Sequence, residues 1–423
     1  MESSASQNTY VFPLKKDHEE IMVKNGLNIE KIQALRRDIH SFPEVAFNEV
    51  ETSRKIKEHL ISFEIEESAI KQCAQTGWVV DIKGTAAPQE KSEDTIEMIA
   101  LRADIDALPI PENNPHLEYK SQTACAHMCG HDGHIATLVA AAQVLAANRD
   151  NIPSNKTVRL LFQPAEEMPG GAIPMIKEGC LEGVDEVYGF HNVPNFEEGD
   201  VRVKAGAIMA ASNKLEIRLK GVGGHGSSPH LCQDVISAGA ALIANLHTIK
   251  SRSIDSKENF ILSITQFHSG HTYNVFPDHA FLQGSIRTYN DDLMAKIIEK
   301  IRHISAKSAE AYDCVAEVTL IPGYAAVINH EKQVDIFKRV ATKYFGEDKV
   351  NEKDLPLTAS EDFSYFLHQK PGCFFMLGTK KAGEPTKVLH TSTYDYNDSV
   401  IGSGAYLYVR LVEDRFGVKI LKE

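Results

Sequence analysis

Ten consecutive residues of this chain, CAHMCGHDGH at positions 125–134, concentrate side chains that bind borderline cations. Cys129 and His131 stand two positions apart in a glycine-containing turn, ahead of a predicted helix. On such a bend both side chains can point at one ion, whereas on a regular helix they could not. His127 and His134 are competing candidates. The stretch therefore predicts part of a metal site, and other segments must supply the remaining ligands.

Three further segments carry candidate ligands where a predicted strand ends or in the loop that follows one. Glu166 and Glu167 follow the strand KTVRLLFQ, His191 ends the strand EVYGFH, and His390 lies in the loop VLHTSTYDYND. A metal hydrolase uses one carboxylate on the ion and another that accepts a proton from water, and adjacent glutamates can divide these tasks. Each signal alone has an ordinary alternative, since acids are common in first helical turns and single histidines are often core residues. Their shared position at strand ends favours a metal site, with enough ligands for two ions.

Two aspartates at the end of another predicted strand complete the set. Asp104 and Asp106, in RADIDALP, are expected to orient the imidazoles of the ligands, with capping of the strand end as the alternative. Cysteine and histidine favour zinc or another borderline ion, while carboxylates also suit manganese.

The elements that must position these residues alternate between strand and helix. Apolar strands and an alanine-rich helix at 134–148 indicate an α/β fold with a mostly parallel sheet covered on both faces. Ligands of such sheets gather beyond the carboxyl ends of the strands, which is where the candidate residues lie.

The pattern changes at residue 207. The stretch NKLEIRLKG alternates apolar and polar residues, as a strand with one solvated face does. The elements that follow it give the order strand, helix, strand, strand, helix, strand, typical of an α+β domain of the split βαβ type. We therefore expect 1–206 and 322–423 to form one main α/β domain and 207–321 to be an inserted βαββαβ domain.

The inserted segment has candidates of its own. His225, in the glycine-rich GVGGHGSSPH, can donate a hydrogen bond to a developing oxyanion from a mobile loop, or can be an exposed polar residue. Asn274 and Arg287 form a candidate amide and guanidinium pair for a substrate carboxylate. Their alternatives are a turn residue and a solvated strand residue.

Composition and charge limit the classes of partner and the cellular compartment that we expect. The formal charge of −13 comes without a long acidic run, which argues against nucleic acid as a partner. No apolar stretch reaches the ~18 residues of a membrane span, and the first twenty residues lack the features of a secretion signal. Most of the seven scattered cysteines are expected to be reduced. We expect a cytoplasmic protein without a membrane partner.

Nine motifs in this order resemble those of a known family: RRDIHSFPE, LRADIDALP, HMCGHDGH, FQPAEE, GFHNVP, GGHGSSPH, NVFPD, EDFSYF and LHTSTYDYND. They resemble the amidohydrolase branch of the dinuclear metallo-aminoacylase and carboxypeptidase family, which includes auxin-conjugate hydrolases, hippurate hydrolases and N-acyl-amino-acid amidohydrolases. The resemblance runs from residue 28 to residue 412. One departure is Met168 and Pro169, where the family usually has glycines, and it affects the expected shape of the adjacent pocket.

The resemblance implies two divalent ions, zinc or manganese, bound by five residues: Cys129, His131, Glu167, His191 and His390. It implies that Glu166 is the general acid/base, taking a proton from the attacking water and returning it to the leaving amine. It also implies that the main domain is a metallopeptidase-like catalytic domain. The insertion is then a lid or dimerisation domain, whose His225 reaches the site of the neighbouring subunit in a homodimer. The expected substrate is a small N-acyl amino acid.

Three alternatives remain open. A carboxypeptidase or dipeptidase could use the same scaffold. A thiol hydrolase could use Cys129 as nucleophile with a nearby histidine as base. A non-catalytic protein could hold a structural metal, although such a protein would not need Glu166.

Overall fold

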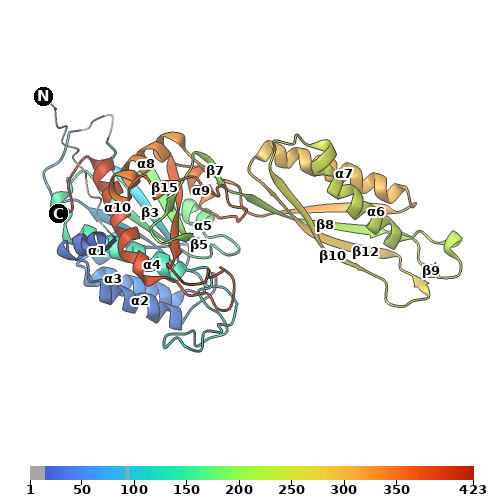
Figure 1. The fold of residues 1–423 in the computed structure, drawn as a ribbon, viewed down its shortest axis with the longest axis horizontal. Coiled ribbons are helices and arrows are strands. Elements are labelled where there is room, and N and C mark those ends of the chain that lie inside the picture. Colours follow the sequence, from blue (N-terminus) through green and yellow to red (C-terminus); the bar gives the residue numbers. More distant parts are fainter. Residues whose placement is uncertain (1–14, 91, 93–94) are drawn as a thin grey trace, which may run out of the picture. The chain divides into compact units, whose positions relative to one another are not determined.

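The computed structural model describes residues 15–90, 92 and 95–423, which separate into two compact units (Figure 1). The larger unit comprises the described residues up to Gly206 together with Asn329–Leu355 and Tyr365–Glu423, and the smaller comprises Ala207–Ile328 and Pro356–Ser364. The smaller unit thus extends beyond 207–321. The reason is strand pairing, because β14 (Val327–Asn329) pairs with β7 (Gly206–Met209), and Met209 forms a bridge with Leu357.

An eight-stranded sheet forms the centre of the larger unit, in the order β1-β2-β4-β3-β5-β16-β6-β15. Its central strands β4 (Thr157–Gln163), β3 (Met98–Asp104), β5 (Glu186–Glu197) and β16 (Gly372–Lys380) run parallel to one another. Antiparallel pairing occurs towards the edges, where β2 (Gly77–Lys83) pairs with both β1 (Ile70–Cys73) and β4. At the other edge β6 (Val201–Arg202) pairs antiparallel with β16 and parallel with β15 (Val350–Asn351). This confirms the predicted α/β class with a mostly parallel central sheet.

One difference concerns β5, which the sequence predicts to end at His191. The strand continues to Glu197 because β16 pairs with it beyond His191, with Gly378 opposite Val193 and Lys380 opposite Glu197. Pro194 cannot donate to the ladder, and it lies where the pairing register shifts, so its missing N–H group removes no ladder bond.

Helix α4 (His131–Ala147) is the central helix of the larger unit and is buried on almost every side. A helix that is apolar all round is one that the protein encloses. It packs against β3, α2 (Ile29–Ser41) and α10 (Ile401–Phe416). Gly404 permits the close approach of α10, since a Cβ atom there would lie 2.8 Å from Thr137 Cγ2.

The remaining helices of the larger unit include α1 (Lys15–Lys24), α3 (Val50–Ser62), α5 (Ala172–Lys177) and α8 (Glu331–Phe345). The short helix α9 (Ser364–Leu367) begins at the boundary between the units. Within the described part of the chain, no helix combines the length and the hydropathy that crossing a membrane requires.

The smaller unit is an antiparallel sheet in the order β10-β12-β8-β13, with α6 (Val235–Thr248) and α7 (Asp291–Glu310) on one face (Figure 1). The strands are β8 (Ala211–Lys220), β10 (Phe260–Ser269), β12 (His279–Thr288) and β13 (Val315–Pro322). Leu215, Ile217 and Leu219 of β8 are buried in the core beneath the helices. A separate two-stranded ladder joins β9 (Gly224–His225) to β11 (Val275–Phe276).

Candidate metal centre

The candidate ligands of the larger unit come from segments that follow or extend the parallel strands. Gly130, with φ of +91°, makes the bend that separates Cys129 from His131. Helix α4 begins at His131, three residues earlier than the sequence predicts, so His131 lies in its first turn. Two residues after β4, Ala165 has φ of +55° and turns the chain so that Glu166 and Glu167 follow.

Cys129 lies at the middle of the cluster. Its Sγ atom is 3.4 Å from His191 Nε2 and 3.3 Å from His390 Nε2. His390 Nε2 is in turn 3.2 Å from Glu167 Oε1. Two groups of three donors therefore share the sulfur, one with His131 and His191 and the other with Glu167 and His390, and the donor atoms within each group lie within 4.8 Å of one another. This arrangement has the donors for two cations that share a thiolate.

The imidazoles of His131 and His191 are oriented by their second nitrogens. His131 Nδ1 lies 2.9 Å from the carbonyl oxygen of Asp106 and 3.2 Å from its Oδ1 atom. His191 Nδ1 lies 2.7 Å from the carbonyl oxygen of Asn192. Protein carbonyls and carboxylates hold metal-binding histidines in this way, leaving Nε2 to the ion. His131 Nε2 is buried and has no hydrogen-bond partner among the described residues, which fits a site built for a cation.

The electrostatics of the cluster also favour a cation. Burial alone would lower the pKa of His131, but Asp104, Asp106 and Glu167 outweigh burial and raise it to about 10. For His191, burial and the neighbouring imidazole of His134 outweigh the effect of Asp104 and lower its pKa to about 3, so it is a neutral metal ligand at physiological pH. Burial, together with the nearby glutamates, raises the pKa of the Cys129 thiol well above its usual value. A thiolate is therefore expected here only when a cation offsets these carboxylates.

Asp104 and Asp106 contact residues that form or surround the cluster. Asp104 Oδ2 accepts from Arg102 Nη1 at 2.6 Å, and Asp104 Oδ1 lies 2.6 Å from His134 Nδ1. Asp106 Oδ2 accepts from the backbone N–H of Glu167 at 3.0 Å. Asp106 therefore contacts both the His131 ring and the backbone of the glutamate pair.

Of the two competing histidines of the decamer, His134 lies beside the cluster and forms a further group of potential ligands with Asp104 and His131. The two ring nitrogens of His134 contact Asp104 and the backbone N–H of Asn192, the latter at 3.1 Å. His127 is buried and belongs to no group of potential ligands among the described residues.

Glu166 is buried beside the cluster, with its Oε2 atom 3.9 Å from His131 Nε2. The turn that carries it is supported by Glu49, whose Oε1 accepts from the N–H of Ala165 at 3.0 Å. Thr76 donates to the other oxygen of Glu49 at 2.6 Å. Sequence reasoning missed Glu49, because an acid near the start of a helix looks like an ordinary first-turn residue. After the glutamates, the Met168–Pro169 peptide bond is cis and Met168 is exposed.

The predicted residues of the smaller unit are described by themselves. His225 is exposed on β9, with its Nδ1 2.7 Å from Ser227 Oγ. The carbonyl of Asn274 accepts from the N–H of Gly226 at 2.8 Å. Asn274 therefore lies beside His225, in the tip formed by the β9–β11 ladder and the loops next to it. Arg287 lies towards the other end of β12 and donates to the carbonyl of Thr358 at 3.0 Å. Eight strand residues, about 26 Å, separate Arg287 from the start of β12, so one chain does not bring Arg287 and Asn274 together.

The chain is similar to known metal-dependent hydrolases in both sequence and structure. The model of Peptidase family M20/M25/M40 matches residues 100–414 of this chain. N-acetylcysteine deacetylase of Bacillus subtilis is 36% identical over 351 residues, which cover 83% of this chain and 88% of that protein. Hippurate hydrolase of Campylobacter jejuni is 34% identical, with coverage of 90% and 95%. Thermostable carboxypeptidase 1 of Saccharolobus solfataricus is 35% identical, with coverage of 89% and 93%.

Solved structures give a similar result. A putative aminohydrolase from methicillin-resistant Staphylococcus aureus superposes with a TM-score of 0.82 at 28% identity, covering 95% of this chain and 100% of that chain. A dinuclear metal-binding peptidase of the M20 family from Bacillus subtilis superposes with a TM-score of 0.77 at 29% identity, covering 92% and 99%.

Proposed function

Because this chain belongs to peptidase family M20/M25/M40 and is a metal-dependent amidohydrolase, we propose that it hydrolyses the amide bond of N-acyl amino acids. Two of the relatives are named for substrates of this kind, N-acetylcysteine and hippurate, which is N-benzoylglycine. The observation that carries the proposal is the position of Glu166, a buried carboxylate beside two groups of metal-binding atoms that share one sulfur.

We assign the binding of two divalent ions, zinc or manganese, to five residues: Cys129, His131, Glu167, His191 and His390. Their mixture of sulfur, nitrogen and oxygen donors suits both metals. When bound, such ions lower the pKa of water and polarise a carbonyl group.

Glu166 carries the proton in this proposal. It accepts a proton from the attacking water and later gives it to the nitrogen of the leaving amino acid, so one carboxylate serves both steps. The contacts of the pair support the role, since Glu167 Oε1 lies 3.2 Å from His390 Nε2, while Glu166 Oε2 approaches His131 Nε2 only to 3.9 Å. Glu167 is itself 4.0 Å from His131 Nε2, so the two carboxylates lie side by side at the cluster. Burial at this position keeps bulk water from competing for the proton.

The smaller unit is assigned to the completion of the site in a homodimer. His225 would donate a hydrogen bond to the oxyanion in the neighbouring subunit, and the substrate carboxylate would be bound by Asn274 of one chain and Arg287 of the other. The exposed apolar side chains of the tip that carries His225 support an interface there, because large apolar residues on a surface mark contact sites. They are Val222, Leu231, Tyr273 and Val275, of which Tyr273 is 100% exposed.

The main alternative is a carboxypeptidase or dipeptidase, which the relative named as a carboxypeptidase favours. A thiol hydrolase is disfavoured by Cys129 itself, since the raised pKa of its buried thiol opposes a free thiolate nucleophile.

The test is a comparison of substrates with metal-replete protein. Acetyl, benzoyl, indoleacetyl and long-chain acyl amino acids are assayed beside unblocked dipeptides with the same carboxyl-terminal residues. The proposal predicts a higher kcat/KM for at least one acylated series. Turnover of the dipeptides alone would favour the peptidase, and activity that survives chelation and is abolished by thiol alkylation would favour the thiol hydrolase.

A further inference from the structure

Arg36 of α2 has a fully buried guanidinium surrounded by three carboxylates. Its Nη1 atom lies 3.1 Å from Asp132 Oδ2 and 3.1 Å from Asp395 Oδ1, and its Nε atom lies 2.8 Å from Asp398 Oδ1. The ring of Tyr119 covers the guanidinium at 4.7 Å from its centroid. No step of the proposed reaction uses this group.

The carboxylates belong to the two segments that deliver separate metal ligands. Asp132 follows His131 in the first turn of α4, and Asp395 lies five positions after His390 in the loop that follows β16. One nitrogen atom of Arg36 therefore contacts both segments. The contact joins the first turn of a buried helix to a segment without helix or strand.

The contact with Arg36 should order the loop that carries His390 more than it orders helix α4. The side chain of His390 is 52% exposed, and its backbone has φ of +60°. A half-exposed loop residue loses conformational freedom when it is fixed on an ion, and contacts that order the loop beforehand reduce that cost.

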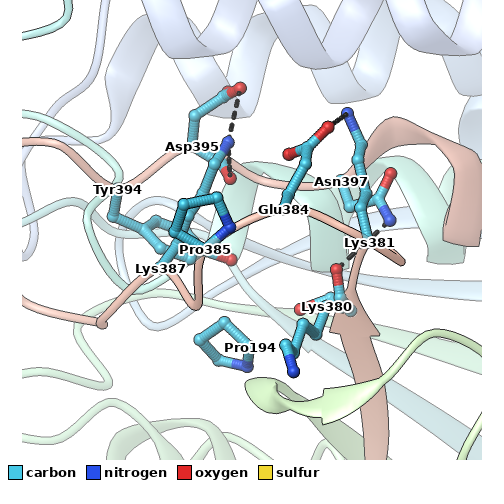
Figure 2. A pocket seen from close by; sticks show the side chains of 10 residues that line it. Pro194, Lys380, Lys381, Glu384, Pro385, Lys387, Tyr394, Asp395 and Asn397 are labelled. Atoms are coloured by element: carbon cyan, nitrogen blue, oxygen red, sulfur yellow. Dashed lines mark hydrogen bonds and ion pairs between the residues drawn. The ribbon is translucent and has the colours of Figure 1, made fainter.

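Other contacts hold the same loop at Asp395. Lys387 Nζ donates to the carbonyl of Asp395 at 3.0 Å and lies 3.3 Å from its Oδ2 atom, and Figure 2 shows both contacts at the edge of a small pocket lined by Tyr394. Asn114 Nδ2 donates to the carbonyl of Tyr394 at 3.1 Å, and Tyr394 accepts at its hydroxyl from Asn192 Nδ2 at 2.7 Å. The loop is thus tied to α2, to the segment before the decamer and to the residue that follows His191.

A second cation of α2 completes the connection to α4. His40, one helical turn after Arg36, has Nδ1 2.8 Å from Asp132 Oδ2 and Nε2 3.2 Å from Glu112 Oε1. Asp132 is therefore held from two positions of the same helix. Buried ion pairs are often no more stabilising than apolar residues of the same size, so their value lies in the geometry that they impose.

We propose that Arg36 is a positioning residue of the metal centre, which fixes His390 relative to His131 by holding Asp395 and Asp132 through one guanidinium. This inference rests on the ligand set assigned under the proposed function. It assigns to Arg36 an effect on metal affinity that is separate from any effect on the stability of the fold.

A second buried ion pair of the larger unit provides the matched control. Arg415 binds Glu186 through two contacts of 2.7 and 2.9 Å, and both side chains are buried. Glu186 begins β5, and five strand residues, about 16 Å, separate it from His191. Breaking this pair disturbs the core to a comparable degree but leaves the segments of the ligands tied together.

The experiment titrates metal-free, full-length protein with Co²⁺ and follows the near-ultraviolet band that arises from sulfur-to-cobalt charge transfer. Arg36→Gln should raise the Co²⁺ dissociation constant about 10- to 100-fold, the range typical of residues that orient ligands. Arg36→Lys should recover only part of the loss, since one ammonium lacks the forked geometry. Arg415→Gln should lower the unfolding temperature of the metal-free protein and leave the dissociation constant within about twofold of wild type.

Three results would overturn the proposal. They are an Arg36→Gln protein that binds Co²⁺ within about twofold of wild type, an Arg36→Lys protein that recovers nothing, and an Arg415→Gln protein weakened as much as Arg36→Gln. Should Arg36→Gln not fold, Asp395→Asn decides the question, with weaker binding expected and unchanged binding contradictory. The variant His390→Ala distinguishes failure of the assigned ligand set from failure of the positioning role of Arg36. If His390→Ala binds normally, the ligand set fails and the positioning role fails with it, whereas weak binding by His390→Ala and normal binding by Arg36→Gln reject the positioning role alone.

Discussion

The sulfur of Cys129 lies 3.3 Å from Nε2 of His390, although 261 positions separate these residues in the chain. The contact joins the bend before α4 to the loop after β16. Because the same sulfur is also 3.4 Å from His191 Nε2, one atom links the two groups of donors. The shared sulfur is the structural reason to expect two ions that are close together.

Replacing Cys129 should therefore disturb the binding of both ions, whereas replacing Cys125, the other cysteine of the decamer, should not. Cys129→Ala removes the shared donor, so we expect the purified protein to lose at least one of the two ions per chain. Cys125→Ala is the matched control, since the Cys125 sulfur lies 3.1 Å from the carbonyl of Pro43 and belongs to no group of potential ligands among the described residues. Elemental analysis after metal loading measures the difference. Equal metal content in both variants would contradict the assignment.

The stability of the metal-free protein should fall with rising pH in a way that depends on His40. Burial by itself would lower the pKa of His40, but hydrogen bonds to Asp132 and Glu112 raise it to about 9. Because folding raises this pKa, the protonated His40 side chain stabilises the folded state. This contribution is fully present below the unfolded pKa of about 6.5 and is lost as pH rises through about 9. The loss is on the order of 3 kcal/mol for a group that is buried throughout.

Denaturant unfolding of metal-free wild type and His40→Gln at pH 6.5 and at pH 9.5 measures this contribution. The difference in unfolding free energy between the two proteins should shrink at the higher pH. A difference that stays constant or grows would show that the His40 pKa is not raised by folding.

The proposed role of His225 predicts complementation between two inactive proteins. Glu166→Gln lacks the proton carrier, and His225→Ala lacks the donor to the oxyanion. If His225 acts in the neighbouring subunit, a mixed dimer has one site with both groups, and mixing the variants under exchange conditions should restore part of the activity. Each variant incubated alone is the control. Mixed dimers that form, as shown by differential tagging, and remain inactive would contradict a role across the interface.

The sequence was sufficient for the fold class because local pattern and burial agree in this protein. Parallel strands require apolar residues on both faces, so β3, β4 and β5 are recognisable as continuous apolar runs. In β8 the alternation of buried and exposed residues corresponds to one covered face. The extension of β5 past His191 was not predictable, because its pairing with β16 depends on a strand about 180 residues later in the chain.

The network around Arg36 was beyond local inference for a similar reason. Arg36 and Arg37 are adjacent and chemically identical, yet the first side chain is 0% exposed and the second is 48% exposed. What distinguishes them is the position of Asp132 and Asp395, which come from distant parts of the chain. Residue types at strand ends identify the candidate ligands, whereas the residues that orient those ligands become visible only when the segments are packed together.

The central claim is that Glu166 moves the proton while five other residues hold the metal, and Glu166→Gln tests it most directly. The metal content of this variant and its kcat/KM for an N-acyl amino acid turned over by wild type should be measured on the same preparation. The account predicts wild-type metal content and a loss of activity of about 10²- to 10⁴-fold, the usual contribution of a general acid/base. Full metal content with activity close to wild type would contradict it.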